Sequence, residues 1–421
     1  MVPGGIGQSA MDDSSISYGE RAKVVLQHRL ADRTNDGWCM FFLSNLKYNP
    51  NITIMNFFKR FCLLSVMMLM AVAMVAQELP KVYILATGGT IAGAGGSSTE
   101  SNYSAGQVAI GTLLDAVPEI KKIAEVEGEQ VVNIGSQDMS DEVWLVLAKR
   151  VNELLARHDV NGVVITHGTD TMEETAFFLS LVVKSGKPVV LVGAMRPSTA
   201  ISADGPANLY NAVVTAVSPA SMNRGVLVCM NGRAYGAADV TKTNTTSVET
   251  FQSPNSGALG YVHNGEVFYY HPADKCEGKC TDYVHKGMKC EGARCCHFDV
   301  DGLKSLPKVG IAYGYSNVEG DVVDMMIEKG YKGIVYAGVG NGNIHKNVFP
   351  ELERARKDGI IVVRSSRVPT GATTLDAEVD DNKYEFVASW GLNPQKARIL
   401  LMLALTKTHD WKKIQEYFNN Y

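Results

Sequence analysis

The chain has 421 residues, of which 46% are hydrophobic and 20% are charged, and its formal net charge is −4. This length suits two or three folded domains with ordinary hydrophobic cores. The balanced charge argues against a broad basic surface, so we expect no nucleic-acid partner.

The N-terminal part has the pattern of an export signal. Residues 1–54 are polar and irregular, and a short basic stretch then precedes an apolar run from Phe61 to Ala76. This order, ending in small residues, is typical of a secretory signal peptide. The run is short for a membrane span, which needs about 20 residues, so a signal anchor is the weaker alternative. We predict a signal peptide over 55–76 and an initiator at Met55, with residues 1–54 an over-extended reading frame or a dispensable tail.

From Pro80 onward, short apolar runs alternate with helical patterns. Apolar runs that are rich in β-branched residues and lack alternation are typical of strands buried on both faces of a parallel sheet. We predict an α/β fold of two domains with mostly parallel sheets, the larger over 77–270 and the smaller over 308–421. The predicted strands are 82–86, 163–165, 188–192, 225–230, 309–313, 333–337 and 360–363, and the predicted helices are 141–158, one beginning near 172, 321–329, 351–357 and 394–406.

A cysteine-rich segment separates the two predicted domains. Five of the eight cysteines lie between Cys276 and His297, within a loop-rich linker over 271–307. Disulfides and a zinc site are both alternatives, but the odd number and the Cys-x3-Cys spacing fit neither well. We expect a surface insert with no catalytic role and no metal. Cys229 lies in an apolar strand and is predicted to be a buried thiol.

Three polar segments follow predicted strands. They are residues 86–93, with paired glycines and Thr90; residues 166–174, which open a helix; and residues 239–246, with Lys242. Open α/β sheets bind ligands at the carboxyl ends of their strands, and a helix N-terminus favours developing negative charge. A lysine among hydroxyls can activate a threonine. Taken singly, each segment also fits a glycine turn, a helix cap or a solvated lysine.

Taken together, the three segments resemble the bacterial type II (periplasmic) L-asparaginases of the asparaginase and glutaminase family. The resemblance covers about residues 80–421, apart from the insert. The motifs that carry it are Thr-Gly-Gly-Thr-Ile at 87–91, Gly-Ser-Gln-Asp at 135–138, His-Gly-Thr-Asp-Thr at 167–171, Gly-Ala-Met-Arg-Pro at 193–197 and Arg-Ser-Ser-Arg-Val-Pro-Thr-Gly at 364–371.

The resemblance implies catalytic roles for five residues. Thr90 corresponds to the nucleophile, and Tyr103 helps to activate its hydroxyl. Thr169, Asp170 and Lys242 correspond to a second polar triad that supports the reaction.

The resemblance also implies a set of substrate contacts. These are Ser136 and Gln137 for the α-carboxylate, Asp170 for the α-ammonium, the Ala194 backbone for the side-chain amide, and Asn343 and Glu378 contributed by a neighbouring subunit.

The implied activity is hydrolysis of L-asparagine to L-aspartate and ammonia through a threonine acyl-enzyme, without metal or organic cofactor. The implied assembly is a periplasmic homotetramer with sites at subunit interfaces and no stable membrane association. A mixed glutaminase-asparaginase is the closest alternative, since one methylene is worth only about 1–3 kcal/mol. Asn343 and Glu378 favour asparagine. A transfer-RNA amidotransferase subunit fits the signal peptide poorly, and an exported amino-acid-binding protein has no need of a nucleophile.

Overall fold

The computed structural model describes residues 78–95, 103–104, 110–273 and 298–421. The predicted signal peptide over 55–76 and the segment before it lie outside the described residues. The insert from Cys276 to His297 also lies outside them.

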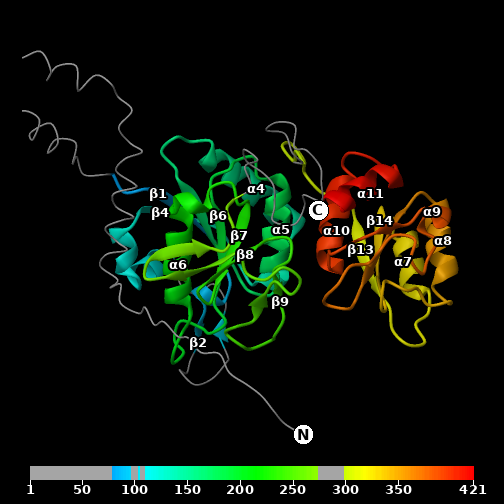
Figure 1. The fold of residues 1–421 in the computed structure, drawn as a ribbon, viewed down its shortest axis with the longest axis horizontal. Coiled ribbons are helices and arrows are strands. Elements are labelled where there is room, and N and C mark those ends of the chain that lie inside the picture. Colours follow the sequence, from blue (N-terminus) through cyan, green and yellow to red (C-terminus); the bar gives the residue numbers. More distant parts are fainter. Residues whose placement is uncertain (1–77, 96–102, 105–109, 274–297) are drawn as a thin grey trace, which may run out of the picture. The chain divides into compact units, whose positions relative to one another are not determined.

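The first sheet has eight strands and runs through the N-terminal part of the chain (Figure 1). Five neighbouring strands are parallel, and three antiparallel strands extend the sheet at one edge. Four of the parallel strands, β1, β5, β6 and β7, are buried and rich in Val, Ile and Leu, as expected where helices cover both faces, whereas the outermost strand β4 is polar and partly exposed. In sheet order the strands are β12 (Glu266–Tyr269), β11 (Gly260–His263), β8 (Arg233–Gly236), β7 (Val226–Met230), β6 (Val189–Val192), β5 (Gly162–Thr166), β1 (Lys81–Gly88) and β4 (Glu125–Ile134).

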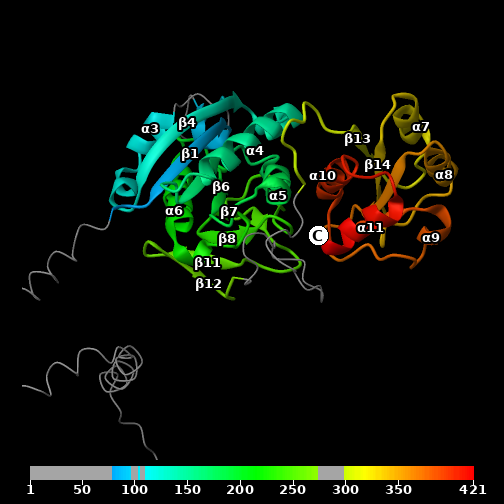
Figure 2. The ribbon, with the colours of Figure 1, turned by 90° about the horizontal axis from the view of Figure 1, so that it is seen from above.

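Helices pack on both faces of this sheet (Figure 2). One face is covered by α4 (Asp141–Leu155) and α5 (Met172–Val182). The other is covered by α3 (Ile110–Asp115) and α6 (Gly205–Val217). Helix α5 is apolar almost all round and is buried on nearly every side, because it packs against the sheet and against other helices. The remaining short elements are η1 (Thr90–Ala92), η2 (Pro118–Lys122), η3 (Ser136–Asp138), η4 (Pro219–Ser221) and the paired strands β2 (Ala94–Gly95) with β3 (Tyr103–Ser104) and β9 (Thr241–Lys242) with β10 (Phe251–Gln252).

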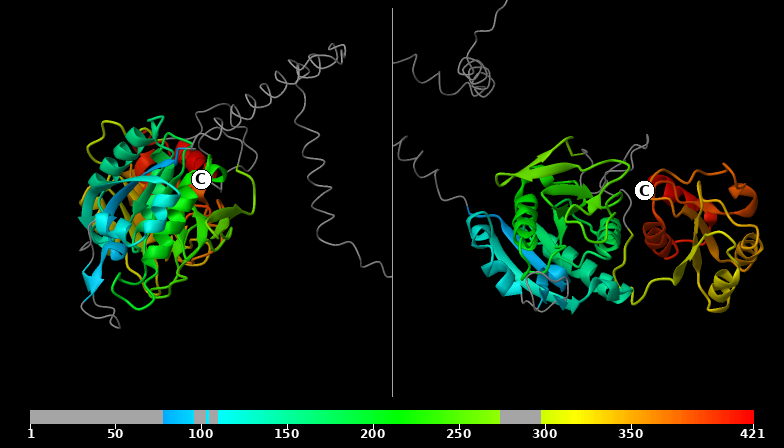
Figure 3. Two further views of the ribbon diagram at one scale, coloured as in Figure 1. Left: turned by 90° about the vertical axis from the view of Figure 1, so that its left-hand side faces the viewer. Right: turned by 90° about the horizontal axis from the view of Figure 1, so that it is seen from below.

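The second sheet has four strands, all parallel, with helices on both faces (Figure 3). Helices α7 and α8 form one core with it, and α10 and α11 pack on its other face. Helix α10 also contacts α5, so a single hydrophobic core joins the two sheets on this side. The elements are β13 (Val309–Tyr313), α7 (Asp321–Glu328), β14 (Gly333–Gly338), α8 (Phe349–Lys357), β15 (Ile361–Ser366), α9 (Asp381–Tyr384), β16 (Val387–Ala388), α10 (Pro394–Ala404) and α11 (Trp411–Asn420).

The predicted α/β class and the mostly parallel sheets are confirmed, but several element bounds were wrong. Helix α4 ends at Leu155 and not at His158, and α10 ends at Ala404 and not at Thr406. Helix α11 was missed, because its sequence is largely polar and only one face is buried, through Ile414 and Phe418. The antiparallel edge strands were also missed. Among the described residues, no helix is long and apolar enough to cross a membrane.

The prediction that Cys229 is a buried thiol is confirmed. Cys229 is a fully buried free thiol in β7, and burial raises its pKa to about 12. Such a group is neutral and unreactive at ordinary pH.

Candidate active site

Four of the predicted site residues follow four neighbouring parallel strands and lie at one edge of the first sheet. The strands β4, β1, β5 and β6 lie side by side in that order, so the segments that follow them are neighbours. The residues that follow these strands are, in the same order, Ser136 in η3, Thr90 in η1, Thr169 before α5, and Ala194. All four are buried.

Two glycines allow these segments to approach each other closely. Gly89 has φ +82°, and a Cβ built on it would lie 2.3 Å from the Gly168 backbone nitrogen. A Cβ on Gly168 would lie 2.5 Å from Ser136 Oγ. Contacts this short are impossible, so a side chain at either position would force the turns apart. Gly89 and Gly168 are therefore required by the packing between these segments.

Hydrogen bonds join the turn after β4 to the turn before α5. The Asp170 backbone N–H donates to Ser136 Oγ at 3.1 Å, and Thr171 Oγ1 donates to the Ser136 carbonyl at 2.7 Å. Gln137 is exposed, and its amide donates to Asp138 Oδ2 at 3.3 Å. Ser136 is thus fixed at the N-terminus of α5, where backbone N–H groups and the helix dipole favour an anion.

Lys242 reaches this edge from β9. Its Nζ donates to Thr169 Oγ1 at 2.9 Å and to Asp170 Oδ1 at 2.7 Å. The lysine side chain is 19% exposed and the aspartate side chain 58%. A polar cavity of about 430 Å³ opens beside this group, lined by Asp170, Lys242 and the 243–245 loop among others. The amine therefore lies between a buried hydroxyl and a carboxylate that water and a ligand can reach.

His167 lies beneath the site and is completely buried. Burial lowers the pKa of its imidazole to about 4, so the ring is neutral at ordinary pH. Its Nδ1 faces the Gly168 carbonyl at 2.7 Å, which requires a donor there, and Nε2 therefore accepts from Thr175 Oγ1 at 2.9 Å. Trp144 Nε1 in turn donates to Thr175 Oγ1 at 2.9 Å. The ring supports the Gly168 turn from below.

Asn343 and Glu378 lie in loops of the second sheet. Asn343 follows β14, Glu378 lies between β15 and α9, and the Asn343 amide donates to Glu378 Oε2. The two predicted residues are thus brought together with each other. Their addition to the site of a neighbouring subunit stays a prediction, because a single chain is described.

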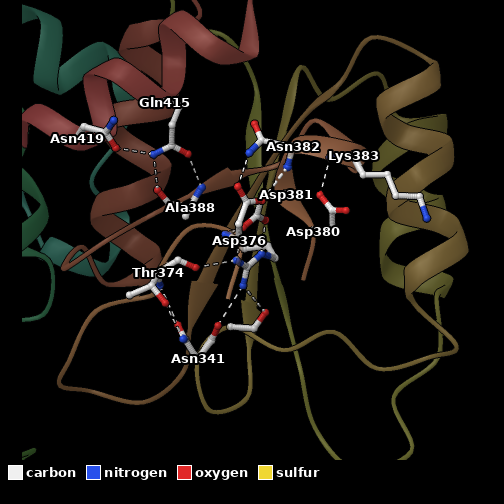
Figure 4. A network of polar contacts seen from close by, with 12 residues as sticks. Asn341, Thr374, Asp376, Asp380, Asp381, Asn382, Lys383, Ala388, Gln415 and Asn419 are labelled. Carbon is white, nitrogen blue, oxygen red and sulfur yellow. Dashed lines mark hydrogen bonds and ion pairs between the residues drawn. The ribbon is translucent and has the colours of Figure 1, made fainter. Parts of the chain in front are cut away.

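A buried ion pair supports these two loops. Arg364 donates to both carboxylate oxygens of Asp381 at 2.5 Å, and neither side chain is exposed to water. Its guanidinium also donates to the carbonyls of Asn341, at 3.0 Å, and Thr374, at 3.1 Å. Asn341 and Thr374 exchange two further hydrogen bonds, so the loops after β14 and β15 are tied together (Figure 4).

Comparison with known proteins identifies the family. The family model "Asparaginase, N-terminal" matches residues 81–275, and the model "Glutaminase/Asparaginase C-terminal domain" matches residues 308–418. The chain belongs to the asparaginase and glutaminase family. This confirms the family resemblance and the predicted class of enzyme, an amidohydrolase.

Individual members of the asparaginase family are similar to this chain in sequence over most of their length. L-asparaginase 2 of Escherichia coli is 58% identical over 367 residues, covering 87% of this chain and 100% of that protein. The probable periplasmic L-asparaginase of Haemophilus influenzae is 59% identical over 346 residues, covering 82% of this chain and 94% of that protein. A solved structure of a probable cytoplasmic L-asparaginase from Campylobacter jejuni has a TM-score of 0.74 at 50% identity, covering 81% of this chain and 99% of that one.

The roles that the family implies divide into three groups in this asparaginase. Thr90, Ser136, Thr169 and Ala194 follow neighbouring strands, and Asp170 and Lys242 join Thr169 through hydrogen bonds. Asn343 and Glu378 form a separate pair on the second sheet. The backbone of Tyr103 lies in β3, paired with Gly95, and its side chain lies outside what is described.

The sequence analysis gave no role to four charged residues that the structure buries, although two of them, Glu173 and Arg364, lie in its motifs; the four are Glu173, Arg364, Asp381 and Lys396. Glu173 stood in the first turn of a helix, where an acidic residue has an ordinary explanation. Lys396 lies within a mostly apolar helical pattern, and this position could have predicted a buried lysine.

Proposed function

We propose that this chain hydrolyses L-asparagine to L-aspartate and ammonia, with Thr90 as the nucleophile. The observation that carries the proposal is the cluster at the ends of four parallel strands. Two buried threonines, Thr90 and Thr169, lie on adjacent strand ends, and one of them is hydrogen-bonded to Lys242. Relatives at 58% and 59% identity are named L-asparaginases, which supports the same substrate here.

The reaction proceeds in two steps, formation of an ester on Thr90 and its hydrolysis. Thr90 Oγ attacks the amide carbon, its proton passes to the leaving nitrogen, and ammonia departs from a tetrahedral intermediate. Water then attacks the resulting ester, which releases aspartate and returns the proton to Thr90. Backbone N–H groups of the glycine turns act as donors to the oxyanion, where prepositioned dipoles contribute most. Tyr103, Thr169, Asp170 and Lys242 support the proton transfers.

Substrate recognition uses the rest of the predicted set. Ser136, at the N-terminus of α5, and Gln137 hold the α-carboxylate, while the exposed carboxylate of Asp170 takes the α-ammonium. The Ala194 backbone contacts the side-chain amide. We assign Asn343 and Glu378 to the site of a neighbouring subunit in a homotetramer. The exposed hydrogen bond between them supports this, because it holds the two residues together although they lie in different loops.

We place the enzyme in the periplasm. The basic and then apolar pattern before Gln77 supports export, and the Haemophilus influenzae relative is named periplasmic. The Campylobacter jejuni protein is named cytoplasmic, so the family contains both descriptions.

The test is ammonia release by the purified protein and its Thr90→Ala variant. We expect wild-type protein to release ammonia from asparagine and the variant to lose about 10³-fold or more in kcat, because no other group replaces the nucleophile. Calorimetry should still detect aspartate binding to the variant. Thr112→Ala, at an exposed threonine on α3, is the matched control and should keep full activity.

Two outcomes would contradict the proposal. Turnover by Thr90→Ala close to that of wild type would remove Thr90 as nucleophile. Equal kcat/KM for glutamine and asparagine would favour the mixed glutaminase-asparaginase, because the two substrates differ by one methylene.

A further inference from the structure

The backbone of Lys242 is held by a buried carboxylate. Glu173, the second residue of α5, is only 4% exposed, and its Oε2 accepts from the Lys242 backbone N–H at 2.8 Å. Its Oε1 accepts from the side-chain amides of Gln395, at 2.5 Å, and Asn393, at 3.4 Å. Asn393 is the N-cap of α10. One carboxylate therefore joins the peptide of Lys242 to the beginning of a helix on the second sheet.

A buried lysine holds the same segment a few residues earlier. Lys396, in the first turn of α10, is 1% exposed, and its Nζ donates to the Ala238 carbonyl at 2.9 Å and the Val240 carbonyl at 2.5 Å. Burial lowers the pKa of this amine to about 8, and the negative charge of Glu173 opposes that shift. A lysine so fully buried is costly unless it is hydrogen-bonded and paired. Here the two carbonyls accept its hydrogen bonds, and the negative charge of Glu173 favours its charged form.

These contacts constrain Lys242 at both ends. Its backbone N–H is bound to Glu173, and its amine is bound to Thr169 and Asp170, which immediately precede the same helix. The first turn of α5 and the two residues before its N-cap thus hold both the backbone and the amine of Lys242. The distance that the amine spans is set by where the backbone is held. A shift of about 1 Å in a group that takes part in chemistry can cost 10²-fold in rate.

We propose that Glu173 and Lys396 are positioning residues that hold residues 238–242 so that the Lys242 amine meets Thr169. Neither group touches substrate. The inference rests on the proposed function, since it assumes that Lys242 takes part in the reaction. It gives the second sheet a part in the site of its own chain, through the first turn of α10.

The first experiment compares two substitutions of Glu173. Glu173→Gln keeps an oxygen that accepts from the Lys242 N–H, whereas Glu173→Ala removes it. We expect kcat for asparagine to fall about 10- to 100-fold in Glu173→Ala and to stay within about threefold of wild type in Glu173→Gln, with KM changed less than about threefold in both. Glu416→Gln, at an exposed glutamate on α11, is the matched control and should leave kcat unchanged.

The second experiment tests whether the effect passes through Lys242. In a Lys242→Met background, Glu173→Ala should lower the residual kcat less than about twofold, because the group it positions is gone. A purely structural role would give the same further loss in both backgrounds. Wild-type kcat in Glu173→Ala, or equal losses in the Ala and Gln variants, would also overturn the inference.

The third experiment does not depend on activity. Amide hydrogen exchange across residues 238–242 should be about tenfold faster or more in Glu173→Ala and in Lys396→Met, because each loses a partner of this backbone. Lys412→Met, at an exposed lysine on α11, is the control. Unchanged protection in Lys396→Met would refute the inference, and this variant carries the test if Glu173→Ala does not fold. If the wild-type protein released no ammonia, the proposed function would be refuted. The hydrogen-exchange result would then still test whether Glu173 and Lys396 hold residues 238–242.

Discussion

An ion pair lies beside the loops that bear predicted site residues on each of the two sheets, and the two pairs differ in their access to water. Arg364 and Asp381 are completely buried, and the guanidinium donates to the Asp381 carboxylate and to the Asn341 and Thr374 carbonyls. Lys242 and Asp170 are 19% and 58% exposed and lie at a cavity. A fully satisfied buried pair fixes loops in one arrangement, whereas an accessible pair can exchange one partner for a substrate group. We therefore expect the Arg364–Asp381 pair to stabilise the fold and the Lys242–Asp170 pair to take part in the reaction.

The comparison predicts the largest effect on rate at the accessible pair. Lys242→Met and Thr169→Val should each lower kcat by about 10²- to 10³-fold, and the double variant should be at most about threefold worse than either, because the two groups act as a unit. Steady-state ammonia assays on all three variants measure this. Stability should change by no more than about 1 kcal/mol on removing the charge of Lys242, as is usual for exposed pairs. Two small losses that simply multiply would mean that the groups act independently.

The buried pair should show the opposite behaviour, with the effect on stability. Arg364→Met leaves the Asp381 carboxylate buried without its partner and should lower the free energy of unfolding by about 3–5 kcal/mol. Urea denaturation measures the change. The double variant Arg364→Met with Asp381→Leu should recover part of the loss, since no lone charge remains. A loss below about 1 kcal/mol in the single variant would show that the pair is not part of the framework.

A smaller and pH-dependent effect is expected at His167. Its pKa in the fold is about 4, below the ordinary 6.5, so between these values the unfolded chain binds a proton that the folded chain does not. The free energy of unfolding should therefore fall by about 3 kcal/mol from this group as pH drops from 6.5 to 4, and it should not change from this group above pH 7. His167→Gln should lose this part of the acid dependence when urea denaturation is compared at pH 7 and pH 4.5. An unaltered difference between the two pH values would contradict the prediction.

The smallest effect is expected outside both pairs. Deleting Cys276–His297, so that Lys275 joins Phe298, should leave asparaginase activity within about twofold and stability within about 1 kcal/mol, because loop length adds only about 0.6 kcal/mol per doubling. Phe298 is itself anchored, with its backbone N–H donating to the Leu181 carbonyl at 3.0 Å and its ring buried. Activity assays and denaturation of the deletion variant check this. Loss of activity in a folded deletion variant, or stoichiometric zinc in the intact protein, would make the insert functional.

Local patterns were enough to predict much of this molecule. Buried strands such as β1 and β5 are recognisable as runs of apolar residues, and the glycine and threonine motifs lie where those strands end. Parallel pairing then places such motifs side by side. The roles of Thr90 and Thr169 were implied by the family resemblance of these motifs, and they stay predictions. Helix α11 escaped prediction because its amphipathic sequence is mostly polar, and it is helical through packing on the second sheet.

The buried charges, in contrast, could be understood only in three dimensions. Glu173 accepts a hydrogen bond from Gln395, 222 residues away, and Lys396 reaches a carbonyl 158 residues away. The residues next to Glu173 and Lys396 in the sequence do not indicate these partners. The cost of burying a charge is offset only where the folded chain brings donors and acceptors together. Strand and turn chemistry follows from adjacent residues. The supports that hold Lys242, Asn343 and Glu378 in place follow from contacts between distant ones.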